Sequence, residues 1–410
     1  MRVMQINAFY GYGSTGRIVE DIQKISEENG IEAYVAYSYT AYDESKLSNC
    51  YKMGNYVSKK LHALLSRING RQGYFSVCST KKLLKHMDKI KPDIVHLHNL
   101  HANFVNINML LDYLEKNNIS TVVTLHDCWL YTGGCYHYTL DGCYKWQDKC
   151  GNCPKKRTDL KSHFIDKTEK NLQDRKRYFG KIKDLSIVGV SSWISEEAKK
   201  SVLNDKKHLV IYNGVDTEFF KDTPSDFKKE HGIEDKFVIL GLGSKWLDPV
   251  NKEAFDYIVK NLPSDCAFVL FGCTKEQIEA LPQGVVGLGY IKNKDTVRKL
   301  YSMADVFVNS TREDTYPTVN MESQACGTPV VTYENTGTGE TVDNMCSFLV
   351  ETEDYKALFE KVMEIKKNGK KAYSDKCREF AEKSFDKEEN YQKYLELYQE
   401  IYEKRQIYKK

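Results

Sequence analysis

The stretch "VFVNSTREDTYPTVNMESQACGTPVVTY" (residues 306–333) decides the fold, because it predicts a strand, a loop, a helix and a second strand in direct succession. Two acids, Glu313 and Asp314, follow the first strand, and Glu322 lies on the helix. A helix between two β-branched runs is typical of parallel strands, and open α/β sheets bind their ligands at the carboxyl ends of such strands. The acids therefore lie where a binding site is expected.

The same alternation of apolar runs and charge-rich helical stretches extends along the chain, which is typical of parallel sheets covered by helices. We predict an α/β fold with two doubly wound domains in tandem, 1–212 and 213–385, and a terminal helix at 386–410. The strands are expected at residues 3–9, 32–38, 93–99, 120–127 and 186–192 in the first domain and at 237–243, 267–272, 285–291, 306–310 and 329–333 in the second.

The segment YQKYLELYQEIYEK (391–404) places tyrosines at helical spacing, so the terminal helix has one aromatic face that must dock on a folded surface.

Composition narrows the class of protein. The length of 410 residues exceeds what one hydrophobic core usually supports, and the hydrophobic fraction of 41% is that of a globular protein. A formal net charge of +3 argues against a dedicated nucleic-acid-binding protein. The chain enters its first strand without a signal peptide and has no apolar run of membrane-spanning length, so we expect a cytoplasmic protein whose 12 cysteines are mostly reduced.

The glycine-rich loop GYGSTG (11–16) follows the first strand and precedes a helix, which is the position of a dinucleotide-binding fingerprint. A nicotinamide dinucleotide site needs an acid at the end of the second strand, yet that strand ends at Ser38 and the next acid is Asp43 in the loop. Two other interpretations stay open: a plain tight turn, or a loop whose backbone amides approach a phosphate or a sugar.

Histidines mark two further strand ends, in HLHNLHANF (96–104) and TLHDCW (124–129). His126 and Asp127 are our candidates for chemistry, because they follow a strand at the edge where ligands bind. The alternative is that these imidazoles are ordinary loop or core residues.

Four cysteines, Cys135, Cys143, Cys150 and Cys153, occur in one turn-rich excursion at 128–154 whose polarity is incompatible with a regular strand. Four nearby thiolates suit tetrahedral zinc, and CGNCP forms a tight Cys-x-x-Cys turn. We expect a structural zinc, because four cysteines leave no open position for catalysis; an iron–sulfur cluster or free or redox-paired thiols are the alternatives.

The segment 58–68 predicts a helix with an apolar stripe and separate basic residues. Such a helix could lie on an anionic membrane surface, or it could be a solvated helix packed on the domain. The stripe comprises Leu61, Leu64, Leu65 and Ile68, and the basic residues are Lys59, Lys60 and Arg67.

Carboxylates at the end of the 306–310 strand can accept hydrogen bonds from sugar or ribose hydroxyls, while amides at the start of the following helix face an anion. The later loop at 336–340 supplies flexible backbone beside them.

With these motifs the sequence resembles a glycosyltransferase of family 4, a family of retaining enzymes with the GT-B fold. The resemblance implies two Rossmann-like domains that face a cleft, with the donor in the second, the acceptor in the first and the terminal helix returning to the first. It rests on the glycine-rich loop (11–16), the HD pair (126–127), SSWISE (191–196), YNGVD (212–216) and the acid-x7-acid helix followed by GTPVV.

In that family the first acid of the motif contacts the donor sugar and the second contacts the nucleoside ribose. Asp314 matches the first position, where glutamate is usual, and Glu322 matches the second. The family also implies a basic pair that neutralises the donor diphosphate without a catalytic metal. Lys252 matches its lysine, and Lys245 is our substitute for its arginine.

The remaining contacts follow from the same resemblance. His126, with Asp127, is expected to help position the sugar, and Asp314 is counted with them as catalytic. The other expected donor-binding residues are Gly13, Thr315, Tyr316 and Thr318.

The resemblance implies transfer of a hexose-type sugar from a nucleoside-diphosphate sugar to a glycan or lipid-linked acceptor. EDTYPTVN (313–320) and the cysteine excursion resemble capsule and exopolysaccharide enzymes, so we expect a role in cell-surface polysaccharide synthesis, with peripheral attachment to the inner face of the membrane as an option. The alternatives are a nucleotide-sugar epimerase of the same fold and a non-catalytic sugar-nucleotide binding module.

Overall fold

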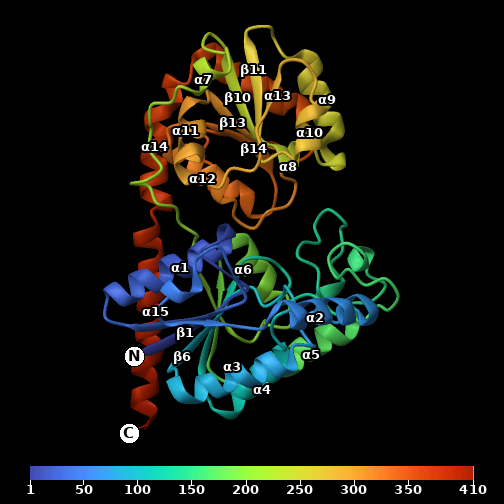
Figure 1. Ribbon diagram of the computed structural model, residues 1–410, viewed down its shortest axis with the longest axis vertical. Coiled ribbons are helices and arrows are strands. Elements are labelled where there is room, and N and C mark those ends of the chain that lie inside the picture. The colour runs from blue at the N-terminus through green and yellow to red at the C-terminus, as the bar shows by residue number, and fades with distance from the viewer. Residues whose placement is uncertain (410) are drawn as a thin grey trace. The chain divides into compact units, whose positions relative to one another are not determined.

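The computed structural model describes residues 1–409 and divides the chain into two compact units (Figure 1). The first unit comprises Met1–Asn213 together with the chain from Glu388 onward, and the second comprises Gly214–Lys387. Each unit holds one large parallel sheet with helices on both faces, so the predicted α/β class with two doubly wound sheets is confirmed.

The first unit is built on a seven-stranded parallel sheet in the order β5-β3-β1-β6-β7-β8-β9. The order reverses between β1 and β6, so the crevice for a ligand is expected at the carboxyl ends of these two strands. The strands are β1 (Arg2–Ile6), β3 (Glu32–Tyr37), β5 (Cys50–Lys52), β6 (Ile94–Leu97), β7 (Ser120–Leu125), β8 (Leu185–Gly189) and β9 (Lys207–Val210), and a separate short pair is formed by β2 (Phe9–Tyr10) and β4 (Tyr39–Thr40).

Helices cover this sheet because their apolar faces are spaced for burial against it. The excursion at 128–154 contains no strand and no α-helix, only short 3-10 turns. The helices are α1 (Gly13–Glu28), α2 (Tyr56–Asn69), α3 (Val77–Ile90), α4 (Ile107–Lys116), α5 (Thr168–Lys181), α6 (Ser192–Lys199) and α15 (Lys387–Lys409).

The terminal helix α15 packs against the first sheet through its tyrosines (Figure 1). Tyr394 and Tyr398 are buried, and their hydroxyls lie 3.0 Å from Thr124 Oγ1 and 2.6 Å from His96 Nδ1, respectively. The last helix is thus bonded to two of the strands that carry the predicted histidines.

The second unit has a six-stranded parallel sheet in the order β12-β11-β10-β13-β14-β15. Its order reverses between β10 and β13, so its ligand crevice is expected at the ends of those strands. The strands are β10 (Phe237–Leu242), β11 (Cys266–Phe271), β12 (Val285–Gly287), β13 (Val306–Asn309), β14 (Val330–Glu334) and β15 (Phe348–Glu351). The helices are α7 (Phe227–Glu230), α8 (Gly243–Trp246), α9 (Lys252–Asn261), α10 (Lys275–Glu279), α11 (Lys294–Met303), α12 (Thr318–Ala325), α13 (Tyr355–Asn368) and α14 (Lys371–Phe385).

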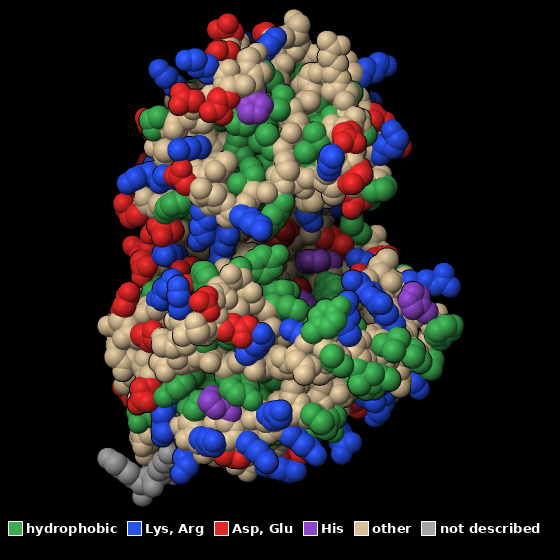
Figure 2. Space-filling view, viewed as in Figure 1, with side chains coloured by type: hydrophobic (Ala, Val, Ile, Leu, Met, Phe, Trp, Pro, Cys, Tyr) green, Lys and Arg blue, Asp and Glu red, His purple; other side chains and the backbone are tan. Residues whose placement is uncertain are grey.

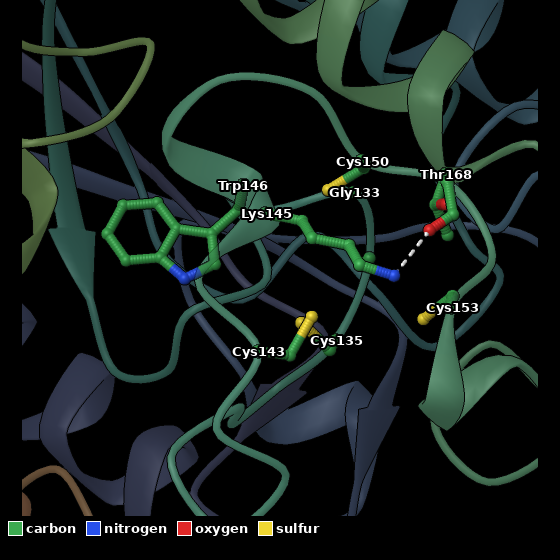
Figure 3. A pocket seen from close by; sticks show the side chains of 10 residues that line it. Gly133, Cys135, Cys143, Lys145, Trp146, Cys150, Cys153 and Thr168 are labelled. Carbon is green, nitrogen blue, oxygen red and sulfur yellow. Dashed lines mark hydrogen bonds between the residues drawn. The ribbon is translucent and has the colours of Figure 1, made fainter.

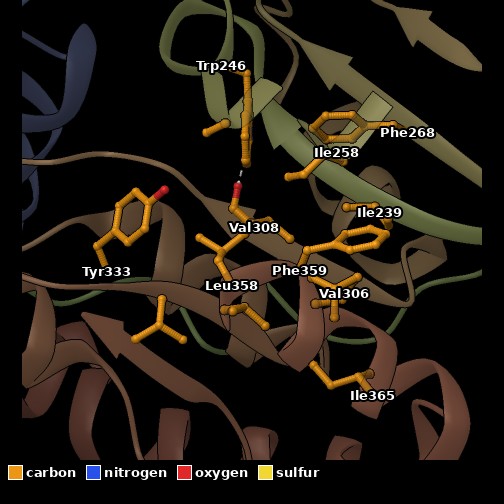
Figure 4. Packing of buried hydrophobic residues seen from close by; sticks show 14 of the residues in the cluster. Ile239, Trp246, Ile258, Phe268, Val306, Val308, Tyr333, Leu358, Phe359 and Ile365 are labelled. Carbon is orange, nitrogen blue, oxygen red and sulfur yellow. Dashed lines mark hydrogen bonds between the residues drawn. The ribbon is translucent and has the colours of Figure 1, made fainter. Parts of the chain in front are cut away.

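The core of the second unit fixes the loop after β10 (Figure 4). The fully buried Trp246 donates a 3.1 Å hydrogen bond from Nε1 to the carbonyl of Val308, and its ring meets Phe268 edge to face at 5.2 Å. A buried indole N–H needs such a partner. This contact holds α8 against β13 and so sets two ligand-side loops beside each other.

Within residues 1–409, no helix is both long enough and apolar enough to cross a membrane.

Candidate active site

Three loops meet at the carboxyl edge of the second sheet, following β10, β13 and β14. The loop after β13 is tied to the 3-10 turn at Thr336–Thr341: the amide of Asp314 donates to Thr336 Oγ1 at 3.1 Å, and the amide of Gly337 donates to the Asp314 carbonyl at 3.2 Å. Asn335 adds a 2.9 Å bond from Nδ2 to the carbonyl of Thr311. The structure thus brings the predicted acid and the predicted flexible loop together.

Asp314 is half-buried, and one carboxylate oxygen accepts the amide of Tyr316 at 3.1 Å. The side chain therefore shapes its own turn. Thr315 and Tyr316 are buried, with the Tyr316 ring packed edge to face on Phe385, while Thr318 is the half-buried first residue of α12.

Glu322 is half-buried on α12 and accepts a 3.3 Å hydrogen bond from the hydroxyl of Tyr301. Burial, and next the nearby charge of Glu322, raise the pKa of Tyr301 well above its ordinary value. The phenol therefore stays protonated and donates to the carboxylate, which is held in a defined orientation.

The two predicted lysines differ in their surroundings. Lys245 is half-buried on α8, directly after β10, whereas Lys252 is exposed at the start of α9 and pairs with Asp256. Between them, Asn251 is buried and donates from Nδ2 to the carbonyls of Lys245 at 3.0 Å and Ser310 at 3.1 Å. This amide joins the loop after β10 to the end of β13.

Arg312 lies at the same edge and was not among the residues predicted from the sequence. Its Nε donates to Asn251 Oδ1 at 3.1 Å, and its guanidinium also donates to the carbonyl of Val250 at 2.6 Å and to Glu353. A half-buried arginine thus braces the segment that leads into Lys252, and it adds positive charge to this edge. The sequence feature that could have identified Arg312 is its position as a basic residue just after the predicted 306–310 strand.

In the first unit, histidines from adjacent strands form a buried stack. His126 Nε2 lies 3.0 Å from His98 Nδ1, and His98 Nε2 lies 3.1 Å from Gln5 Oε1. Burial lowers the pKa of His126 to about 4 and that of His98 well below its ordinary value, so both rings are neutral at pH 7. In a pair of neutral rings one nitrogen donates and the other accepts.

Asp127 pairs with His101: the Oδ2–Nε2 distance is 2.9 Å. Its other oxygen accepts the amide of Trp129 at 2.9 Å. Burial acts to raise the pKa of Asp127, but the His101 ring and the Trp129 amide outweigh it and lower that pKa. The carboxylate is therefore ionised, and it orients His101 rather than His126.

The glycine-rich loop divides into packed and open positions. A Cβ on Gly11 would overlap the ring of Tyr42, and one on Gly16 would lie 3.0 Å from Phe9 Cβ. Gly13, by contrast, begins α1 with a left-handed φ of +67° and has open space around it. Of the three glycines only Gly13 has open space around it, whereas Gly16 packs on Phe9 and Gly11 has a left-handed φ of +62° that favours glycine.

Two adjoining cavities lead from the histidine edge along α2. One, of about 290 Å³, is lined by His101 and Tyr136, and the other, of about 730 Å³, by Lys52, Lys59 and Lys60. Ala63 and Asn103 line both of them. Ala102 and Asn103, at the border of these cavities, have left-handed φ angles of +76° and +63°.

Helix α2 buries polar residues and exposes apolar ones, which is the reverse of an amphipathic helix packed on a hydrophobic core. Its polar residues His62 and Ser66 are only 1% and 3% exposed, whereas Leu61, Leu64 and Ile68 are 54%, 54% and 46% exposed. The helix therefore packs on the domain through these polar residues and exposes most of its apolar stripe, of which Leu65 is half-buried.

His62 explains the orientation of α2: its Nε2 accepts the amide of Gly73 at 3.1 Å and its Nδ1 lies 2.5 Å from Ser76 Oγ. Of the predicted basic residues, Lys59 turns inward, donating to the carbonyl of Ser38 at 3.0 Å, while Lys60 and Arg67 are exposed. Figure 2 shows hydrophobic side chains beside Lys and Arg on the part of the surface that carries α2.

The four clustered cysteines, Cys135, Cys143, Cys150 and Cys153, line one cavity of about 20 Å³. All are free thiols, and as the side chains stand no group of three or more His, Cys, Asp or Glu residues within 1–409 is close enough to hold a metal ion.

Two family models match the chain. The model described as Glycosyltransferase Family 4 matches residues 29–219, and the one described as Glycosyl transferases group 1 matches residues 236–368, so that together they span most of the sequence. The chain belongs to glycosyltransferase family 4.

Relatives of this family 4 glycosyltransferase include WcaC of Escherichia coli (strain K12), which is named for colanic acid biosynthesis and glycosyl transfer. The two are 21% identical over 81% of this chain and 82% of WcaC. YtcC of Bacillus subtilis (strain 168), also named as a glycosyltransferase, is 28% identical over 44% of this chain and 51% of its own.

Solved structures show the GT-B fold of this family 4 enzyme. Sucrose-phosphate synthase from Thermosynechococcus elongatus superposes with a TM-score of 0.70 at 14% identity, covering 98% of this chain and 99% of its own. Anabaena Alr3699/HepE in complex with UDP superposes with a TM-score of 0.66 at 16% identity, covering 98% of this chain and 100% of its own.

Proposed function

We propose that the chain is a retaining hexosyltransferase that moves a sugar from a nucleoside-diphosphate sugar to a glycan or lipid-linked glycan in cell-surface polysaccharide synthesis. The observation that carries this proposal is the edge of the second sheet, where Asp314, Glu322 and Lys245 follow strands on both sides of the point at which the strand order reverses. The titles of the Alr3699/HepE structures, which name UDP and UDP-glucose, support a nucleotide-sugar donor.

Each group at that edge suits one part of such a donor. Glu322 accepts hydrogen bonds from the ribose hydroxyls and Asp314 from the sugar hydroxyls, because ionised carboxylates are acceptors only. Lys245 and Lys252 offset the charge of the diphosphate, with Arg312 bracing the segment before Lys252. Stabilising the phosphate oxyanion as it departs is commonly the largest contribution to catalysis.

The reaction breaks the bond between the sugar C1 and the phosphate oxygen and forms a bond from C1 to the acceptor oxygen on the same face of the sugar. The acceptor proton passes to the departing phosphate oxygen, so no protein nucleophile is required. His126, Asp127 and Gly13 are the residues of the first unit that we assign to positioning the reacting sugar. No catalytic metal enters this scheme, since the sequence contains no Asp-x-Asp pair to hold a nucleotide-bound cation.

The acceptor is assigned to the adjoining cavities of the first unit. Three lysines line the larger cavity, which suits an acceptor that carries phosphate, and the smaller one reaches His101. A lipid-linked glycan has such a phosphate next to its lipid. The name of WcaC, which refers to colanic acid biosynthesis, supports a polysaccharide product.

The exposed apolar side of α2 supports peripheral attachment to an anionic membrane at the inner face of the cell envelope. Leu61, Leu64 and Ile68 would enter the lipid interface, while Lys60 and Arg67 meet the headgroups. The larger cavity adjoins the same helix through Tyr56 and Ala63, so a lipid-linked acceptor could enter it from the membrane surface.

A donor screen tests the proposed function. The purified chain is mixed with UDP-, GDP- and ADP-sugars in EDTA, with and without lipid-linked glycan acceptors, and released nucleotide and the anomeric configuration of the product are measured. We expect acceptor-dependent release in EDTA with retention at C1. Epimerised donor without transfer, an inverted product, or donor binding without turnover would each overturn the proposal.

A further inference from the structure

We propose that Cys135, Cys143, Cys150 and Cys153 form a structural zinc site within the excursion between β7 and α5. The four side chains line a single cavity of about 20 Å³ (Figure 3). This volume is large enough to hold one ion or one water molecule.

Hydrogen bonds hold the backbone of the cysteine excursion in place around the cavity. The hydroxyl of Thr132 donates to the carbonyl of Cys135 at 2.9 Å and accepts the amide of Gly134 at 3.2 Å, and the amide of Cys153 donates to Asp166 Oδ2 at 2.7 Å. These bonds fix the backbone of Cys135 and Cys153 and so hold both residues beside the cavity.

Glycine is required at two positions of this backbone. A Cβ on Gly133 would lie 2.9 Å from the Cys150 sulfur and 2.8 Å from Thr168, so only glycine allows this approach. In the Cys150–Cys153 turn, Gly151 and Asn152 have left-handed φ angles of +143° and +47°. The turn therefore presents both of its cysteines to the same cavity.

Positive charge also surrounds the cavity. A zinc ion with four thiolates has a formal charge of −2, which favours nearby cations. Lys145 lines the cavity and donates to the carbonyls of Gly151 at 3.2 Å and Asn152 at 3.3 Å. The buried Arg175 interacts electrostatically with Cys150 and Cys135.

Zinc would supply the cross-link that the excursion lacks. The four cysteines line one cavity, and as their side chains stand they are not close enough to hold a metal ion, so zinc binding requires them to move to a zinc–sulfur distance of about 2.3 Å. The segment has no α-helix, strand or disulfide among its described residues. Tyr136, in this segment, has its ring centroid 4.8 Å from that of His101. Both residues line the smaller cavity to which we assign the acceptor, so a metal here would stiffen one wall of that cavity.

Metal analysis of the whole chain tests the site. The protein is purified under reducing, anaerobic conditions without a metal-chelating tag, and we expect about one zinc ion per chain. Cys150→Ser/Cys153→Ser should lose the zinc, whereas Cys78→Ser, which changes an exposed thiol on α3, should keep it. Cobalt exchange into the wild-type protein should give the strong visible absorption of tetrahedral cobalt–thiolate, a readout that does not require any variant to fold.

Negligible metal, iron with the absorption of a cluster, or a cobalt spectrum without thiolate ligation would each overturn the proposal. Zinc retained by Cys150→Ser/Cys153→Ser would overturn it as well.

Discussion

The hydroxyl of Tyr301, on α11, donates a hydrogen bond of 3.3 Å to the carboxylate of Glu322, on α12. The bond fixes the carboxylate at the edge where we place the nucleoside ribose. The tyrosine is fully buried, so this orientation depends on the core of the second unit and not on a mobile surface contact.

Glu322→Gln should weaken UDP and the UDP-sugar by the same factor, roughly 10- to 100-fold, because a hydrogen bond to a charged group contributes about 1.5–3 kcal/mol. Calorimetry with both ligands measures the effect. Tyr301→Phe is the matched control: it keeps the carboxylate but removes one of its donors, so the loss should be smaller. Unequal losses for the two ligands would place Glu322 on the sugar instead.

Asp314→Asn should leave the affinity for free nucleotide nearly unchanged while lowering turnover of the sugar donor. Asparagine retains an oxygen that can accept the Tyr316 amide, so the turn survives and only the charge beside the sugar is lost. Calorimetry and transfer rates separate the two effects. Glu313→Gln, one residue earlier, is the control, and if it abolished transfer instead the assignment of the motif would be shifted by one residue.

His126→Asn should lower the transfer rate by about 100-fold without changing nucleotide affinity, because a misplaced reacting group costs a factor of this size. Nucleotide binding is assigned to the other unit and should not respond. His86→Asn serves as the control, since that ring stacks on Tyr51 away from the histidine stack. A loss of nucleotide affinity in His126→Asn would contradict the role that we assign.

Lys60→Gln/Arg67→Gln should weaken attachment to anionic liposomes by roughly 10- to 30-fold, since each basic residue near such a surface contributes about 1 kcal/mol. Leu61→Ser/Leu64→Ser/Ile68→Ser should weaken attachment to liposomes further, and it should abolish the attachment that persists at high salt. Sedimentation with vesicles measures both, with Lys260→Gln/Lys275→Gln in the second unit as the control. Equal binding by all variants would show that α2 does not meet the membrane.

Acid should destabilise the protein through its buried histidines. Burial lowers the pKa of His62 and of His126 to about 4, and lowers those of His96 and His98 well below their ordinary value. Between pH 6.5 and 4 the unfolded chain then binds more protons than the folded chain, so stability falls as the pH falls. Each such histidine contributes up to about 1.4 kcal/mol per pH unit.

Urea unfolding at pH 7.5, 6 and 5 measures this dependence. His62→Gln should reduce the slope between pH 6 and 5, because it removes one buried proton-binding group. A midpoint that does not change from pH 7.5 to 5 would contradict the assignment of neutral buried rings.

The sequence predicted most of both sheets because the central strands are almost entirely buried and therefore apolar. It did not predict β5, β9 and β15, whose short sequences CYK, KHLV and FLVE lie at sheet edges, where partial exposure permits charged residues and weakens the pattern. The strand predicted at 285–291 ends at Gly287.

The candidate site shows a similar division. Glu322, Asp314 and His126 could be located because strand ends can be recognised locally. The role of Arg312 could not be predicted. It depends on β10 and β13 being neighbours in the sheet although β11 and β12 lie between them in the sequence, and this pairing brings Asn251 within reach of Arg312. The outward face of α2 depends in the same way on His62 bonding to Gly73 and Ser76, which helical periodicity does not reveal.

The tyrosines of α15 also determine the order in which the two units can finish folding during translation. The second unit is one uninterrupted segment, whereas the first needs residues from Glu388 onward to bury its sheet and to bond Thr124 and His96. The unit that is translated first is consequently the last to be completed, and until then its apolar sheet face is exposed to chaperones. A chain that terminates before Tyr391 would leave that face exposed permanently, and chaperones and proteases would recognise it as incompletely folded.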